Sequence, residues 1–212
     1  MKKYLNLALV VITATGTLFS CKKDSAPKDY ASLFNNTVWT GEFHYTLKTV
    51  QPVSIEFKTG GQLTWYELAG EFPGTWKLDN GKITITFPSA NTVTADITSD
   101  NKLTNMQHTG SSWVIDNAEL NTTPDETVDN TKWGTTNLLF TFKAGDKVDT
   151  NLGPIPGGIL YSNATYTRKA KSIRITYLQY KFFNVFVSTT VMNGINQPTG
   201  DPAIYPYKVT KQ

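Results

Sequence analysis

The chain contains two copies of one sequence pattern, offset by about 90 residues. Four pairs of segments match in the same order: 35–42 with 129–136, 57–60 with 142–145, 74–87 with 164–178, and 109–110 with 199–200. Within the longest pair, Ile83 and Ile85 correspond to Ile173 and Ile175. Chance does not readily place four matches in order, so the pattern indicates a duplicated structural unit.

Apolar and polar residues alternate with a period of two from Thr37 onward, which is typical of strands with one buried and one solvated face. Turn dipeptides such as Gly60-Gly61 and Asn80-Gly81 separate the alternating stretches. No amphipathic helix is recognisable, so the chain is expected to be all-β. The residues expected to face the interior of the first unit are Trp39, Phe43, Tyr45, Leu47, Val53, Ile55, Phe57, Ile83, Ile85, Phe87, Val93, Ala95 and Ile97.

Each unit has room for about six to eight short strands, which predicts two tandem antiparallel β-meanders, each curling toward a small barrel. The expected boundaries are 35–121 for the first unit and 130–212 for the second. Residues 122–129 are polar and acidic and contain a proline, as is typical of a linker. One larger barrel built from both halves is the alternative.

The first 20 residues have the character of a secretory signal, because two lysines precede an apolar stretch that ends before the single cysteine, Cys21. The sequence "LFSC" at 18–21 resembles the lipobox of bacterial lipoproteins. That resemblance implies a lipid on Cys21 and anchoring of the protein to a membrane through it. Residues 21–34 are polar and are expected to form a flexible tether.

The tether carries two short motifs, at 23–24 and 24–26, that partly resemble the export and O-glycosylation signals of Bacteroidetes-type lipoproteins. The resemblance implies an outer-membrane location, with the periplasmic and the cell-surface face both left open. The formal net charge of +3 falls to +1 once the signal, with its two lysines and no acid, is removed. The charge therefore gives no indication of a nucleic-acid partner.

Each unit opens with a tryptophan beside a glycine, Trp39-Thr40-Gly41 in the first and Trp133-Gly134 in the second. An early tryptophan followed by a meander of short hairpins resembles the lipocalin-like lipoproteins. The resemblance implies small barrels, and in that family a barrel encloses a ligand cavity. Lipocalins carry Gly-x-Trp in place of the order found here, which is a departure from the family pattern.

Few residues suggest catalysis or metal binding. The histidines, His44 and His108, are expected to be solvated side chains, because no cluster of three or four metal ligands is visible. Paired carboxylates that lie close together in space are the usual catalytic groups for glycan cleavage. Glu67 and Glu71 are close in sequence, but the glycine and proline at 70–73 suggest that a loop lies here. We therefore expect no catalytic residue, no metal site and no cofactor.

The aromatic residues are the better candidates for a binding role. Trp39, Trp76 and Trp113 stand beside apolar neighbours in expected strands, and core packing is the simplest interpretation of each. Trp65 and Tyr66 are adjacent, so they point to opposite faces of one strand and one of them must lie outside the core. Both are candidate ligand-binding residues.

The strand expected at 180–188 has two apolar faces. Its inner face is expected to consist of Phe183, Val185 and Val187. Phe182 and Phe186 then form an outer apolar patch, which is expected to pack against the first unit or a covering loop, or else to dock a partner or ligand. Phe182 and Phe186 are therefore also candidate binding residues.

Three functional hypotheses follow. The first is a non-catalytic binding module, anchored in the envelope, for a small apolar ligand, a glycan or an envelope protein. The second is an inhibitor or interaction lipoprotein that acts on a hydrolase, and the third is a glycan-processing enzyme. A cavity inside a unit would favour the first, an exposed contact loop the second, and carboxylates gathered in a cleft the third.

Overall fold

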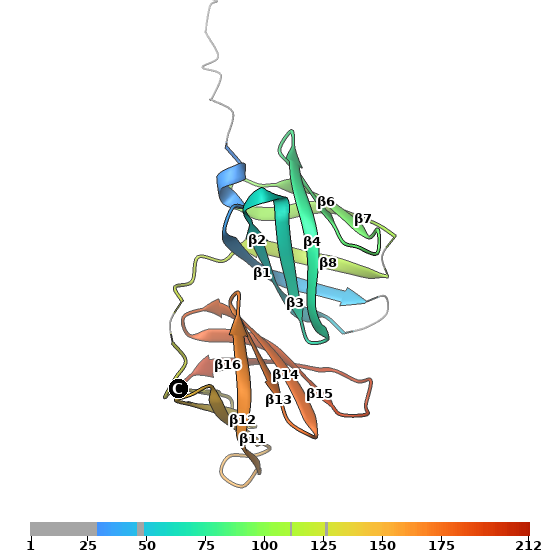
Figure 1. Ribbon diagram of the computed structural model, residues 1–212. Helices are drawn as coiled ribbons and strands as arrows, with labels where there is room; N and C mark the ends of the chain where they lie inside the picture. Colours follow the sequence, from blue (N-terminus) through green and yellow to red (C-terminus); the bar gives the residue numbers. More distant parts are fainter. Residues whose placement is uncertain (1–28, 46–48, 111, 126) are drawn as a thin grey trace, which may run out of the picture.

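The computed structural model describes residues 29–45, 49–110, 112–125 and 127–212. These residues form two separate closed antiparallel barrels of eight strands each, in tandem along the chain (Figure 1). The prediction of two all-β barrel units is confirmed, and the alternative of a single larger barrel is wrong. Closure of each barrel satisfies the backbone hydrogen bonds that edge strands would leave open.

Barrel 1 is an up-and-down meander that closes by pairing its first strand with its last. Its elements are η1 (Ala31–Leu33), β1 (Thr37–Tyr45), β2 (Gln51–Lys58), η2 (Thr59–Gly61), β3 (Gln62–Glu67), β4 (Gly70–Asp79), β5 (Lys82–Thr86), β6 (Thr92–Ile97), β7 (Lys102–Thr109) and β8 (Trp113–Leu120).

Barrel 2 repeats this order strand for strand and closes through its own first and last strands. Its elements are β9 (Lys132–Gly134), β10 (Leu138–Lys143), β11 (Lys147–Leu152), β12 (Ile159–Lys169), β13 (Ser172–Thr176), β14 (Tyr180–Ser188), β15 (Val191–Pro198) and β16 (Tyr205–Lys211). Each matched pair of sequence segments falls on equivalent elements, for example β4–β5 and β12–β13.

The segment before β1 closes one end of barrel 1. Phe34 follows η1, is fully buried, and stacks on the fully buried Trp39 with ring centroids 4.7 Å apart. The indole of Trp39 also donates a hydrogen bond to the carbonyl oxygen of Leu33 at 3.1 Å. The expected inner face of barrel 1 is confirmed, with Tyr45 only partly buried and Leu47 outside the described residues.

The core of barrel 2 is organised in the same way, with Val128 and Trp133 buried at the end where the chain enters. Phe182 and Phe186 also belong to this core and are almost completely buried. Asn184 lies between them in sequence and is fully buried, and its side-chain oxygen accepts a hydrogen bond from the hydroxyl of Tyr207 at 2.9 Å.

The assignment of the faces of β14 from the sequence is therefore wrong. Phe182 and Phe186 point into barrel 2, whereas Phe183 and Val185 lie on its outer face and Val187 is 44% exposed. Both rows are apolar, so alternation alone does not tell which row faces inward. The idea that the outer apolar row packs against the first unit is correct, but it applies to Phe183 and Val185.

A small apolar cluster joins the two barrels. Tyr66 and Leu68 from barrel 1 pack with Phe183, Val185 and Ile195 from barrel 2, and all five are buried. Tyr66 is thus the member of the Trp65–Tyr66 pair that lies outside the core of barrel 1, as the adjacency of the two residues predicts. Barrel 2 shields it from solvent.

The connection between the barrels is held at both ends. The side-chain amide of Asn121 donates hydrogen bonds to Thr40 Oγ1 at 3.1 Å and to the carbonyl oxygen of Phe186 at 2.7 Å, so it touches both barrels. Farther along, Asp125 forms an ion pair with Lys171. The signal sequence, Cys21 and most of the tether lie outside the described residues, and within the described part no helix is long and apolar enough to cross a membrane.

Candidate functional site

The end of barrel 1 opposite η1 opens into a cavity of about 370 Å³. In an up-and-down meander, the ends of β1, β3 and β5 and the starts of β4 and β8 meet at the same end of the barrel. The side chains that line the cavity come from these strand ends and from the turn after β5. They are Tyr45, Trp65, Glu67, Phe72, Pro73, Phe87, Pro88, Ser89, Asn91 and Trp113.

Three aromatic rings form the main wall of the cavity. The ring centroids of Trp65 and Trp113 are 5.3 Å apart, those of Trp65 and Phe87 are 5.9 Å apart, and those of Phe87 and Trp113 are 5.5 Å apart. The rings meet in edge-to-face and tilted arrangements, which are the favourable geometries for aromatic pairs. Of the four predicted binding residues, Trp65 is the one that lines this cavity.

Glu67 lines the cavity and is only 3% exposed. One carboxylate oxygen accepts a hydrogen bond from the hydroxyl of Tyr45 at 3.0 Å, and the other accepts one from the indole of Trp65 at 3.0 Å. Burial raises the pKa of Glu67, and the two hydrogen bonds and the charge of Arg174 partly oppose this increase.

A signal for this role of Glu67 was present in the sequence. Glu67 stands two residues after Trp65, so the two side chains share the inner face of β3. Our expectation of a loop at 70–73 hid this relationship and is wrong, because β4 begins at Gly70. Pro73 is compatible with a strand here, because β4 extends past the end of β5 and pairs only with β3 at this residue.

A second hollow of about 470 Å³ adjoins the cavity. Tyr45 and Glu67 line both spaces, so the Glu67 carboxyl group lies between them. Barrel 2 contributes Pro202, Ala203 and Ile204, from the connection between β15 and β16, to the far side of this hollow. The site is thus enlarged by the second barrel.

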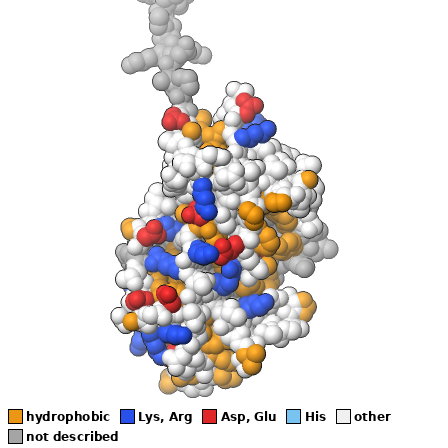
Figure 2. All heavy atoms as spheres, viewed as in Figure 1, with side chains coloured by type: hydrophobic (Ala, Val, Ile, Leu, Met, Phe, Trp, Pro, Cys, Tyr) orange, Lys and Arg blue, Asp and Glu red, His pale blue; other side chains and the backbone are white. Residues whose placement is uncertain are grey.

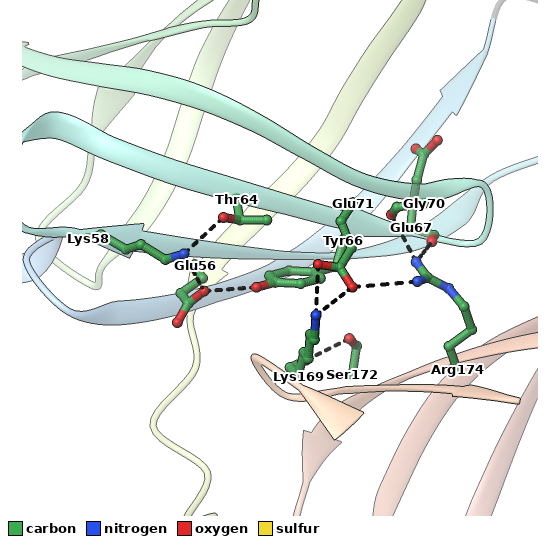
Figure 3. Close-up of polar contacts among 10 residues, drawn as sticks. All are labelled: Glu56, Lys58, Thr64, Tyr66, Glu67, Gly70, Glu71, Lys169, Ser172 and Arg174. Carbon is green, nitrogen blue, oxygen red and sulfur yellow. Dashed lines mark hydrogen bonds and ion pairs between the residues drawn. The ribbon is translucent and has the colours of Figure 1, made fainter. Parts of the chain in front are cut away.

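Barrel 2 also holds the β3–β4 hairpin that carries Glu67 (Figure 3). The guanidinium of Arg174 donates hydrogen bonds to the backbone carbonyl oxygens of Glu67 at 2.6 Å and Gly70 at 2.9 Å. Glu71 accepts from Lys169 at 2.9 and 3.0 Å. The hydroxyl of Tyr66 donates a hydrogen bond to the carboxylate of Glu56 at 2.9 Å. Tyr66 is thus a junction residue and does not line the cavity.

The polar residues considered for chemistry are dispersed. The carboxyl group of Glu67 faces the cavity, whereas that of Glu71 pairs with Lys169 outside it, so the two do not flank one cleft. His44 Nδ1 lies 2.9 Å from Asp116, and His108 accepts a hydrogen bond from the backbone N–H of Ile115. Within the described residues no three His, Cys, Asp or Glu side chains come together as a metal site requires.

The equivalent end of barrel 2 is different. Rings of Tyr161, Tyr177 and Tyr180 pack together there, with centroids 5.4 and 5.5 Å from Tyr161. Around them the rim exposes aliphatic side chains, and Figure 2 shows apolar side chains at this lower end of the molecule. The most exposed are Ile159 at 64%, Leu160 at 60% and Leu178 at 84%.

The fold and the site together define a tandem pair of eight-stranded antiparallel barrels with an aromatic cavity in the mouth of the first. Comparison of the chain with models of protein families, with curated proteins and with solved structures gave no match.

Proposed function

We propose that the protein is a lipid-anchored, non-catalytic binding module that takes a small ligand into the mouth of barrel 1. The observation that carries the proposal is the cavity of about 370 Å³, with aromatic walls and a single buried carboxyl group. Cavities that hold small molecules are commonly of this order of size, largely apolar, and furnished with a few polar groups that orient the ligand. Glu67, Asn91 and Ser89 are such groups.

The resemblance of residues 18–21 to a lipobox supports anchoring of the chain to the outer membrane through Cys21. The described chain enters barrel 1 beside η1 (Figure 1). The cavity lies at the other end of this barrel. If the lipid anchor precedes η1 in the chain, the mouth of barrel 1 faces away from the point of membrane attachment. This arrangement suits a module that receives ligand from the surrounding medium.

Binding can be tested with an uncharged fluorescent probe of suitable size, N-phenyl-1-naphthylamine. Its fluorescence should increase when it enters the aromatic cavity of the wild-type protein. The substitution Ser89→Trp places a large ring at the mouth, in the turn after β5, and should weaken probe binding at least about tenfold, equivalent to about 1.4 kcal/mol.

The matched control is Ser99→Trp, which makes the same exchange at an exposed turn at the opposite end of barrel 1. This variant should bind the probe as the wild-type protein does. Failure of the wild-type protein to bind the probe, or equal weakening by both substitutions, would contradict a binding site in the mouth of barrel 1.

A further inference from the structure

Among its described lining residues, the cavity in the mouth of barrel 1 has one acidic side chain and no basic one. Among the described residues that line it, Glu67 is the only carboxylic acid, and no lysine, arginine or histidine is present. The remaining lining is aromatic, proline or neutral polar. The charge of the lining therefore limits which charge a ligand can carry. This inference rests on the proposed binding function and adds the class of ligand to it.

The carboxyl group of Glu67 forms no ion pair with a lysine, arginine or histidine among the described residues, although the charge of Arg174 acts on it. Its two hydrogen-bond donors, Tyr45 and Trp65, are neutral. Arg174 directs its guanidinium to backbone oxygens and to Glu71, with Nη1 3.8 Å from the latter. A buried carboxylate without a directly paired cation is costly, and a cation brought by a ligand would offset that cost.

The aromatic walls favour the same kind of ligand. Faces of aromatic rings carry negative electrostatic potential, and a cation within about 6 Å of a ring centroid is attracted, most strongly where water is excluded. Trp65 contributes both to the ring cluster and, through its indole N–H, to the carboxylate. A positive group near Glu67 would therefore lie beside both the ring of Trp65 and the carboxylate.

We propose that the cavity in the mouth of barrel 1 binds an organic cation, a ligand with an apolar body and an ammonium group that pairs with Glu67. The same features disfavour other classes. The carboxylate of a fatty acid would find no basic partner among the described lining residues and would approach Glu67. A sugar would leave most of its hydroxyl groups against aromatic and proline side chains.

A charge series of equal-sized compounds tests this inference at pH 7. Benzylamine carries a positive charge, benzyl alcohol none and benzoate a negative one, while the ring is the same. We expect benzylamine to displace N-phenyl-1-naphthylamine at a concentration about tenfold lower than benzyl alcohol does, because its ammonium makes a charged hydrogen bond. Benzoate should be the weakest competitor.

The variant Glu67→Gln should abolish the advantage of benzylamine over benzyl alcohol, so that the two compounds displace the probe at similar concentrations. Asp79→Asn, which removes an exposed carboxylate at the opposite end of barrel 1, is the matched control and should retain the full charge preference. The inference is overturned if the three compounds compete equally, if benzoate is the strongest, or if Glu67→Gln keeps the preference. Those results would leave the proposed function standing, because that function fails if the uncharged probe does not bind or if Ser89→Trp and Ser99→Trp weaken its binding equally.

Discussion

At the scale of single residues, Glu67 is the least expected feature of the protein. It occupies the last inward position of β3, after Leu63 and Trp65, in a row that is otherwise apolar. A residue used only for packing would be apolar at this position, because burial disfavours the charged form of a carboxyl group. Buried ionisable groups with shifted pKa values gather at functional sites, and here the shifted group borders the cavity.

Glu67 should make stability depend on pH. Because burial raises its pKa in the folded state above the ordinary value of 4.5, its contribution to stability is complete below pH 4.5 and is lost as the pH rises through the folded-state pKa. Tyr45 and Arg174 are the titratable and charged groups that act on it. The wild-type protein should therefore lose stability relative to Glu67→Gln as the pH is raised from below 4.5 through the folded-state pKa.

The measurement is the free energy of unfolding in urea for both proteins across this range. The difference between the two curves is informative, since other titrating groups act equally on both. A difference that stays constant with pH would show that Glu67 has the same pKa in the folded and unfolded states.

At the scale of strands, alternation and repeats predicted most of the fold. Val53, Ile55 and Phe57 are buried as their period of two predicts, and both units form barrels. The convergence of Trp65, Phe87 and Trp113 was not predictable in this way, because it depends on barrel closure, which brings together strands far apart in sequence. The sequence did suggest that the outer apolar row of β14 packs against the first unit, but the reversed face assignment did not place Phe182 and Phe183 correctly.

The faces of β14 show where the repeat itself held more information. Ile85 pairs with Val93 in barrel 1, and the equivalent Ile175 pairs with Phe182 in barrel 2. Val93 and Phe182 are thus equivalent, and both face inward. A comparison shifted by one residue reverses the assignment of every side chain on a strand. The polar Asn184, in the inward row, made the reverse assignment of the faces look reasonable.

Substitutions on β14 should distinguish its two faces. Phe182→Ala removes a fully buried ring from the core of barrel 2 and should lower the free energy of unfolding by about 3–5 kcal/mol. Val187→Ala acts on a side chain that is 44% exposed and should cost less than about 1 kcal/mol. Guanidinium unfolding followed by circular dichroism measures both. The opposite order of the two effects would restore the face assignment made from the sequence.

At the scale of the whole molecule, the two copies of the duplicated unit differ at their equivalent ends. Barrel 1 keeps an open aromatic mouth, whereas tyrosine rings pack in the mouth of barrel 2. The outer wall of barrel 2 covers Tyr66 and binds the β3–β4 hairpin through Arg174. The second barrel thereby supports the site in the first, and we expect the two barrels to behave as one body in solution.

Cutting the connection between the barrels tests this expectation. A protease recognition sequence inserted after the exposed Thr122 would allow the backbone to be cut without removing either barrel. The cut protein should elute from a size-exclusion column as the uncut protein does, because buried contacts among Tyr66, Phe183 and Ile195 remain.

The same cut should separate the barrels once those contacts are weakened. Phe183→Ser removes an almost completely buried ring from the junction, and Arg174→Ala removes the hydrogen bonds to the β3–β4 hairpin. With both substitutions the cut chain should elute as two half-sized fragments, while the uncut chain stays folded because Phe183 lies outside the core of barrel 2. If the cut wild-type protein already separates, the junction is too weak to hold the hairpin, and the support of the site by barrel 2 must be abandoned.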